Sequence, residues 1–367
     1  LGKIKMIIAP IKNLIDYFFG RGEHSVFVPV MDGPFKPNEF LDNIKLFSSL
    51  DSVDNLEKCK TENVCSSGKD LFSFKAGGKL RKVHEFDSDI TAIAFNEERG
   101  ILAVALVTGE VFTTPLSKIK LNKEFSDECI TSMAFVEDLL LYTKGSTNFQ
   151  SSQWKYDLMS KEPTGSISVS SLDGNNPKVL ASNLAWPAGI INFIDGQICV
   201  SEAWEHRVCF YKFNKDEITL SLLQQSLDKL PAYPGKLFFD LSKNQIWVSF
   251  FAPRNQLVEF VLKEDEYRNK MVDQIPEDLW ISPTYRSGKS MQEPLQHSGI
   301  KTMGYLKPWA PAFSYGLFVN FDINLRALSS FHSRTNGSFH GTTSLIIDEK
   351  NNFFVSSRGD NKIGMWK

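Results

Sequence analysis

The sequence has no long hydrophobic run, no strong excess of one charge and no cluster of metal-binding side chains. No apolar stretch among its 367 residues reaches the roughly 18 residues that a membrane-spanning helix needs. The formal net charge of −2 provides no basic surface, so we expect no nucleic-acid partner. The sequence contains no Cys-x-x-Cys motif and no Cys/His cluster, which argues against a structural zinc site.

Familiar catalytic signatures are also missing. The sequence has no Gly-x-Ser-x-Gly nucleophile elbow, no phosphate-binding loop and no Ser-His-Asp order. Any catalysis therefore has to come from side chains that the fold brings together.

The five cysteines show no pairing pattern. Cys129, Cys199 and Cys209 lie within or beside predicted strands, where cysteine usually acts as a small buried hydrophobic residue. Cys59 and Cys65 flank a polar loop. We expect free thiols there, with a disulfide between them as the alternative in an oxidising compartment.

The sequence instead contains one short pattern six times. An alternating apolar strand is followed by a turn and by a second, more apolar strand. The first strands are clearest at 90–95, 130–135, 187–191, 234–238 and 342–346. The second strands lie at 71–74, 101–106, 139–142, 198–202, 246–250 and 353–357. Repeats of roughly 40–50 residues with several strands each are typical of a β-propeller. We therefore predict an all-β fold, a six-bladed β-propeller whose functional site lies at one mouth of the central channel.

The predicted organisation is an N-terminal apolar helix and linker over residues 1–37, followed by the propeller over 38–367. Segment 4–19 is apolar but too short to span a bilayer. We expect a helix packed against the outside of the propeller, with contact to a membrane surface as the alternative. The last blade, 335–367, is expected to borrow a strand from the N-terminal region and so close the ring.

Two blades contain long insertions, at 146–163 and 253–312. Both lie between a second and a third strand, so we expect them to cover the same mouth of the channel. The larger insertion is predicted to contain a helix over 258–272, followed by an aromatic, proline-rich segment that forms a stiff lid.

The candidate site consists of polar residues at strand ends, together with aromatic residues near the insertions. Glu202 ends an apolar strand, Lys236 interrupts the start of one, and Arg358 follows the last second strand, so we predict these three as catalytic. The predicted ligand-binding residues are Asn38, Lys144, Trp154, Trp204, Trp309 and His340. A carboxylate among cations can form an anion site or an acid–base site with shifted pKa values. The structural alternatives are an ion pair of Glu202 with Arg207 or Lys236, an inter-blade pair for Arg358 and a turn hydrogen bond for His340.

Several motifs resemble a known family. Residues 184–190 (LAWPAGI) with 200–208 (VSEAWEHRV), and 233–236 (YPGK) with 246–248 (IWV), resemble the strictosidine-synthase-like branch of the gluconolactonase/paraoxonase superfamily. The resemblance covers about 38–367. It implies a six-bladed propeller and, for the hydrolases of the superfamily, a calcium ion held by asparagines at inner-strand starts.

Two departures from the family pattern change what the resemblance implies. The calcium-binding positions hold Ala188 and Lys236, of which the first offers no side-chain oxygen and the second repels a cation, so we expect no metal and no other cofactor. Ser344 stands where strictosidine synthase has its glutamate. A serine cannot perform that acid–base role near neutral pH.

The leading functional hypothesis is a hydrolase of a small ester or lactone that works without calcium. Glu202 would act as general base, and Lys236 or Arg358 would stabilise the developing negative charge. The first alternative is a non-catalytic propeller that binds a small molecule, an anion among the candidates, between aromatic side chains. The second is a Pictet–Spengler lyase or synthase, which Ser344 disfavours.

Overall fold

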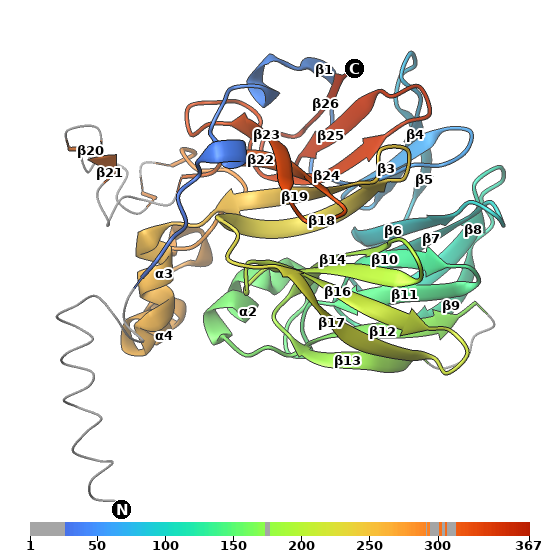
Figure 1. Ribbon diagram of the computed structural model, residues 1–367, viewed down its shortest axis with the longest axis horizontal. Coiled ribbons are helices and arrows are strands. Elements are labelled where there is room, and N and C mark those ends of the chain that lie inside the picture. Colours follow the sequence, from blue (N-terminus) through green and yellow to red (C-terminus); the bar gives the residue numbers. More distant parts are fainter. Residues whose placement is uncertain (1–25, 173–176, 291, 294–300, 303–304, 307–312) are drawn as a thin grey trace, which may run out of the picture.

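The chain folds into six four-stranded antiparallel sheets arranged as the blades of a propeller (Figure 1). The computed structural model describes residues 26–172, 177–290, 292–293, 301–302, 305–306 and 313–367. The predicted all-β, six-bladed propeller is confirmed. Within each blade, successive strands pair with their neighbours, so the first strand of the blade is the innermost.

The first three blades follow the chain without interruption of strand order. Blade one contains β2 (Val53–Glu57), β3 (Asn63–Ser67), β4 (Asp70–Phe74) and β5 (Arg81–Glu85). Blade two contains β6 (Ile90–Asn96), β7 (Ile101–Leu106), β8 (Glu110–Pro115) and β9 (Asn122–Ser126). Blade three contains β10 (Ile130–Val136), β11 (Leu139–Lys144), β12 (Gly165–Ser171) and β13 (Lys178–Leu184).

The last three blades complete the ring. Blade four contains β14 (Pro187–Asn192), β15 (Gln197–Glu202), β16 (Arg207–Asn214) and β17 (Thr219–Leu227). Blade five contains β18 (Ala232–Asp240), β19 (Gln245–Pro253), β22 (Gly316–Asp322) and β23 (Ala327–Ser333). Blade six contains β24 (Thr342–Ile347), β25 (Phe353–Ser357), β26 (Lys362–Trp366) and the early strand β1 (Lys45–Ser49).

Strand β1 closes the ring by pairing antiparallel with β26, and Lys45 lies opposite Met365. This pairing is the predicted borrowing of an N-terminal strand, and it removes the open edge of the last blade. Two 3-10 turns, η1 (Gly33–Phe35) and η2 (Leu41–Asn43), lead into β1 and contact β23.

One prediction about blade one is wrong. Residues 71–74 belong to the third strand, β4, whereas β3 is the second strand and β2 is the innermost. Strand β2 reads Val-Asp-Asn-Leu-Glu, so only two of its five residues are apolar. An alternating hydrophobic pattern cannot identify such a strand, because its inward side chains face a polar channel.

The insertions of blades three and five meet beside the propeller. The first contains η3 (Ser151–Gln153) and α2 (Trp154–Ser160). The second contains α3 (Gln256–Lys263), α4 (Asp265–Gln274), η4 (Glu277–Leu279) and the short pair β20 (Lys301–Thr302) and β21 (Tyr305–Leu306). The helix predicted over 258–272 is thus two helices, which meet at Glu264, where the backbone leaves the helical conformation (φ −90°, ψ 83°).

The helices of the two insertions share a small hydrophobic core. Met159 of α2, Val261 of α3 and Met271 of α4 are buried together with Trp280. The three helices accordingly lie on the same side of the blades (Figure 1). Burying these side chains against one another makes the two insertions one packed unit.

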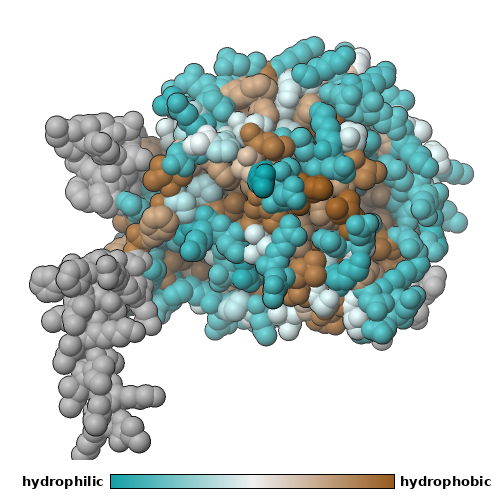
Figure 2. All heavy atoms as spheres, viewed as in Figure 1, coloured by the Kyte–Doolittle hydropathy of each residue, from teal (hydrophilic) through white to brown (hydrophobic). Residues whose placement is uncertain are grey.

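Hydrophobic side chains between neighbouring blades form the main cores, for example around Phe210, Val248 and Phe321. Figure 2 shows hydrophilic side chains around the rim of one face and hydrophobic ones gathered toward its middle.

All five cysteines are buried free thiols, as the sequence favoured. No helix of the described residues is long and apolar enough to cross a bilayer. Segment 4–19, with its predicted helix and membrane contact, lies outside the described residues.

Candidate functional site

Each inner strand shifts its pairing register near its start. The shifts fall at Val53/Leu56, Ile90/Ala92, Ile130/Ser132, Pro187/Gly189, Pro234/Leu237 and Thr342/Leu345. An irregularity of this kind re-aims a side chain that the regular pleat would place elsewhere. Each inner strand contains one copy of the repeated sequence pattern, such as Ile90-Thr91-Ala92-Ile93. The residue at the second position of each copy lines one pocket at the channel mouth; these residues are Asp54, Thr91, Thr131, Ala188, Gly235 and Thr343.

This pocket is a cavity of about 140 Å³, and one of its walls is aromatic. The wall consists of Trp154, Trp186, Trp204, Phe251 and Tyr285. The rings of Trp186 and Trp204 stack at 5.5 Å, and the ring of Trp154 meets that of Tyr285 edge-on at 5.6 Å. Residues from both insertions therefore line the same mouth, since Trp154 belongs to the first and Tyr285 to the second.

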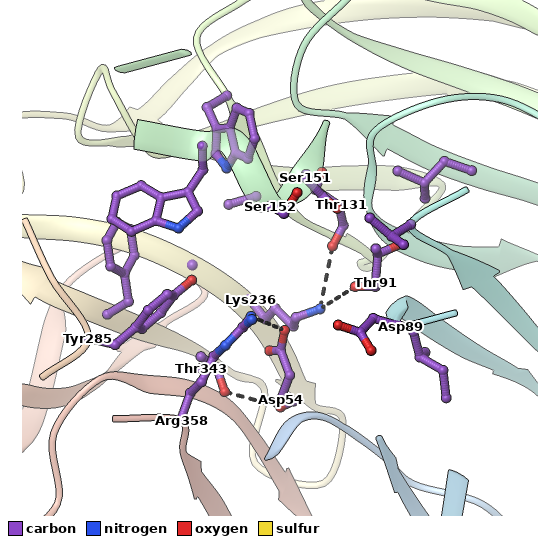
Figure 3. A pocket seen from close by; sticks show the side chains of 18 of the residues that line it. Asp54, Asp89, Thr91, Thr131, Ser151, Ser152, Lys236, Tyr285, Thr343 and Arg358 are labelled. Atoms are coloured by element: carbon purple, nitrogen blue, oxygen red, sulfur yellow. Dashed lines mark hydrogen bonds and ion pairs between the residues drawn. The ribbon is translucent and has the colours of Figure 1, made fainter. Parts of the chain in front are cut away.

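The opposite wall carries charges of both signs (Figure 3). Nη1 of Arg358 lies 3.2 Å from Oδ2 of Asp54, and the guanidinium lies over the ring of Tyr285 at 5.1 Å. Burial raises the pKa of Tyr285, so its phenol stays neutral near pH 7. Asp89 is exposed and points into the pocket. No described residue forms a hydrogen bond or close ion pair with its carboxylate, whose charge acts on Arg358 at longer range.

Lys236 reaches the channel from β18. Its Nζ donates to Oδ1 of Asn55 and lies 3.4 Å from the carbonyl oxygens of Thr91 and Thr131. Nδ2 of Asn55 donates to Oγ of Ser66 at 2.8 Å, which turns Oδ1 toward the ammonium. Burial lowers the pKa of Lys236, and the carboxylate of Asp54 partly opposes that effect. Lys236 also lines a second cavity of about 240 Å³, which lies further along the central channel. Its side chain therefore lies between the two cavities.

The structure brings four of the predicted site residues together in the first pocket: Lys236, Arg358, Trp154 and Trp204. Glu202 is not among the lining residues. It is 1% exposed, its Oε2 accepts from the backbone N–H of Ala185 at 3.0 Å, and its Oε1 accepts from Nε of Arg207 at 2.9 Å. This is the structural alternative for Glu202, and the placement does not support a role as general base at the pocket.

The other predicted residues lie outside this pocket. Asn38 bonds to strand β23, donating to the carbonyl of Ser330 at 2.9 Å. Lys144 forms an ion pair with Asp127. Asn38 was placed in the site because the true first strand of blade one, β2, escaped detection. Trp309 lies outside the described residues.

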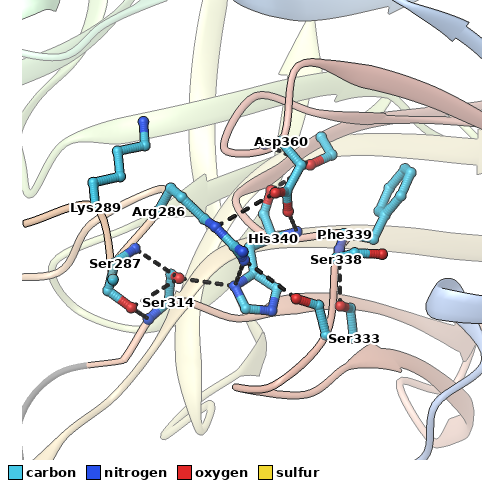
Figure 4. Close-up of polar contacts among 12 residues, drawn as sticks. Arg286, Ser287, Lys289, Ser314, Ser333, Ser338, Phe339, His340 and Asp360 are labelled. Carbon is cyan, nitrogen blue, oxygen red and sulfur yellow. Dashed lines mark hydrogen bonds and ion pairs between the residues drawn. The ribbon is translucent and has the colours of Figure 1, made fainter.

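His340 does not line the pocket; it is buried between β23 and β24, at the junction of blades five and six (Figure 4). Its Nδ1 lies 2.8 Å from Oγ of Ser314 and 2.6 Å from Nη1 of Arg286, and its Nε2 lies 2.7 Å from the carbonyl oxygen of Arg334. A neutral ring protonated at Nε2 donates to the Arg334 carbonyl, and the one lone pair of Nδ1 is shared by Arg286 and Ser314. His340 thus anchors the residue after Tyr285 to the propeller.

Sequence reasoning missed Asp54 and Asp89, and it placed Tyr285 in the aromatic lid without naming it as a site residue. The signal for Asp54 was present, because Val53-Asp54-Asn55-Leu56 aligns with the phrase Ile90-Thr91-Ala92-Ile93. Asp89 directly precedes that second phrase. Tyr285 carries no sequence signal of its own, since its place depends on how the larger insertion packs.

A divalent metal does not fit the oxygens at the axis. Asn55, Thr91 and Thr131 direct their oxygens at the ammonium of Lys236, whose charge opposes a second cation. Ala188 adds no side-chain oxygen. No group of three or more His, Cys, Asp or Glu side chains within the described residues is arranged to hold a metal ion.

Comparisons with solved structures agree with the propeller architecture. A gluconolactonase from Xanthomonas campestris superposes with a TM-score of 0.55 at 11% identity, covering 88% of this chain and 87% of its own. A luciferin-regenerating enzyme gives 0.52 at 10% identity, covering 89% and 92%. A protein described as a putative gluconolactonase gives 0.55 at 9% identity, covering 88% and 91%. At these identities the likeness establishes the fold. No protein-family model and no curated protein matches the sequence.

Proposed function

We propose that the pocket hydrolyses a small ester or lactone without a metal, with Asp89 as general base and Arg358 as the partner of the developing oxyanion. The observation that carries this proposal is that one pocket contains both the exposed carboxylate of Asp89, which forms no hydrogen bond with a described residue, and a guanidinium that Asp54 and Tyr285 hold in place. The aromatic wall would bind the apolar part of the substrate. The likeness to lactone-acting propellers is consistent with this chemistry.

The roles of the two cations differ. The ammonium of Lys236 has three protons and three protein oxygens around it. Arg358 has five N–H donors, and its side chain is 40% exposed. Arg358 therefore has donors left for a substrate oxygen, whereas Lys236 is engaged by the protein.

The proposed reaction begins with water in the pocket. Asp89 takes a proton from that water, and the water oxygen attacks the carbonyl carbon of the substrate. The carbonyl oxygen then carries the negative charge, which Arg358 stabilises. The tetrahedral intermediate collapses with cleavage of the C–O bond, and the leaving oxygen takes the proton from Asp89. The products are a carboxylic acid and an alcohol, joined in one molecule if the substrate is a lactone.

The test is a panel of chromogenic esters and lactones, assayed with and without EDTA. We expect turnover that EDTA does not reduce. Asp89→Asn should lower kcat by about 10²-fold or more while the thermal midpoint is retained. Asp87→Asn, two residues away on the exposed surface, is the matched control and should keep wild-type turnover. Equal kcat for wild type and Asp89→Asn on every hydrolysed substrate would remove Asp89 from the mechanism.

A second candidate is a binding protein without catalysis. It is favoured by the aromatic wall, whose five rings could hold the apolar part of a ligand opposite Arg358, while the two carboxylates and two cations of the pocket balance in charge. In that case small carboxylates such as benzoate should quench the fluorescence of the pocket tryptophans with saturation, and no ester or lactone in the panel should be turned over. Loss of quenching in Arg358→Gln would assign the anion contact to the guanidinium.

Membership of the strictosidine-synthase-like branch is also a proposal, supported by the motifs at 184–190 and 200–208. Two charged residues of the second motif, Glu202 and Arg207, form an ion pair within blade four. Ser344 lies beside the second cavity, where its hydroxyl accepts from the backbone N–H of Leu56 at 3.1 Å. A Pictet–Spengler reaction would have to use Asp89 or Asp54, and product formation from an arylethylamine and an aldehyde would reveal it.

A further inference from the structure

The channel axis is surrounded by oxygens that three different blades supply. Asn55 comes from blade one, Thr91 from blade two and Thr131 from blade three, and all three direct an oxygen at Nζ of Lys236 from blade five. Each of these partners is more than a hundred residues from Lys236 in the sequence. The contact therefore exists only in the closed ring.

The backbone at Lys236 is built to hold the side chain there. Oγ of Ser249 lies 2.8 Å from the carbonyl oxygen of Lys236 and 2.8 Å from that of Thr343, so its one proton is shared between the two. On the other side, a Cβ on Gly189 would lie 3.0 Å from Cα of Lys236 and 2.6 Å from the carbonyl oxygen of Gly235. Only a residue without a side chain lets the two inner strands approach so closely at this point.

In other blades, serine hydroxyl groups donate to the backbone carbonyls at the positions that correspond to Thr91 and Thr131. Ser201 donates to the carbonyl of Gly235 at 2.6 Å and Ser356 to that of Asp54 at 3.0 Å, while Ser249 shares its proton between the carbonyls of Thr343 and Lys236. At Thr91 and Thr131 the ammonium takes this place. Since a buried carbonyl without a donor is costly, Lys236 completes the set of hydrogen bonds around the axis.

We propose that Lys236 supplies a resident cation for the propeller, a tethered ammonium that fills an oxygen cage in which a short neutral side chain would leave a binding site for a divalent metal. The oxygens of Asn55, Thr91 and Thr131, with the nearby carboxylate of Asp54, are of the kind that Ca²⁺ prefers. The ammonium provides the positive charge without a bound ion. This inference does not depend on whether the pocket is catalytic.

Calcium titrations followed by thermal unfolding test the inference. The wild-type midpoint should be the same in EDTA and in millimolar Ca²⁺. Lys236→Asn should have a lower midpoint in EDTA, because the three oxygens lose their donor. Calcium should raise the midpoint of this variant by about 2 °C at a tenfold excess over the dissociation constant, which we expect near 10⁻⁴ to 10⁻³ M.

Lys144→Asn is the matched control, since Lys144 pairs with Asp127 outside the cage, and it should gain no response to Ca²⁺. If Lys236→Asn does not fold, Lys236→Gln takes its place in the same titration. A calcium-induced rise in the wild type would overturn the inference, because the cage would then accept an ion beside the ammonium. Absence of any calcium response in the folded Lys236 variant would overturn it as well.

Discussion

Nε1 of Trp204 donates a hydrogen bond to Oδ1 of Asp157 at 2.7 Å, which ties the aromatic wall of the pocket to helix α2 of the first insertion. Asp157 is 2% exposed, and burial raises the pKa of its carboxyl. The insertion thus does more than cover the mouth, because it holds one of the rings that line it.

Substitution of Asp157 should separate the hydrogen bond from the charge. Asp157→Ala leaves the indole N–H without a buried acceptor, so we expect a loss of about 1–3 kcal/mol in the free energy of unfolding. Asp157→Asn keeps an acceptor oxygen and has no buried charge to form, so it should be at least as stable as the wild type at pH 7. Denaturant unfolding measures both. Equal stability of the Ala and Asn variants would show that the hydrogen bond does not matter.

The second insertion is seated on glycines of blade six. A Cβ on Gly359 would overlap the carbonyl oxygen of Tyr285 and lie 2.8 Å from that of His340. Gly359→Ala should therefore push Tyr285 away from the pocket and cost about 1–3 kcal/mol. Gly77→Ala is the control, since a Cβ there meets nothing within 4 Å. The measurements are the thermal midpoint and the affinity for the carboxylate probe. If Gly359→Ala and Gly77→Ala have the same thermal midpoint and the same affinity, close packing of the second insertion on Gly359 does not position Tyr285.

The sequence predicted the parts of the fold in which local and tertiary preferences agree. The phrase Ile90-Thr91-Ala92-Ile93-Ala94-Phe95 alternates along its length, and it is an inner strand. Strand β2 is polar because it faces the channel, and this hid Asp54 and shifted the prediction to Asn38. A helix break such as that at Glu264 leaves no mark in a run of charged residues.

The candidate site was harder to predict than the fold because it depends on which blades become neighbours. Lys236 and Arg358 were found because each interrupts or ends an apolar strand. Glu202 has the same sequence signature, yet Arg207 and the N–H of Ala185 engage its carboxylate. Only the three-dimensional arrangement distinguishes a strand-end acid inside the pocket from one inside a blade.

His340 predicts a loss of stability in acid. Burial lowers the pKa of His340, so the unfolded chain binds more protons than the folded one below the ordinary value near 6.5. The stability contribution is complete above that pH and is lost as the pH falls. Protonation would also remove the acceptor for Arg286 and place two positive charges together. The slope of unfolding free energy between pH 6.5 and 5 should be smaller in His340→Gln, and an unchanged slope would contradict this prediction.

For Glu57 we expect the opposite pH dependence: the free energy of unfolding should fall as the pH rises. Glu57 lines the second cavity, and its Oε1 accepts from the backbone N–H of Phe95 at 3.1 Å. Burial raises the pKa of Glu57 to about 8, and the nearby Lys236 partly opposes the rise. The folded chain therefore holds a proton that the unfolded chain releases above its own value of about 4.5.

The stability contribution of Glu57 should consequently be complete below pH 4.5 and be lost as the pH rises toward 8. Across that window it lowers the free energy of unfolding by up to about 1.4 kcal/mol per pH unit. Glu57→Gln cannot ionise, so denaturant unfolding between pH 5 and 8 should show a smaller slope than in the wild type. Lys236→Met should raise the pKa of Glu57 in the folded chain, because it removes the positive charge that favours the ionised carboxylate. The loss of stability should then continue to a higher pH than in the wild type. A Glu57→Gln slope equal to the wild-type slope would mean that Glu57 is already ionised in the folded channel.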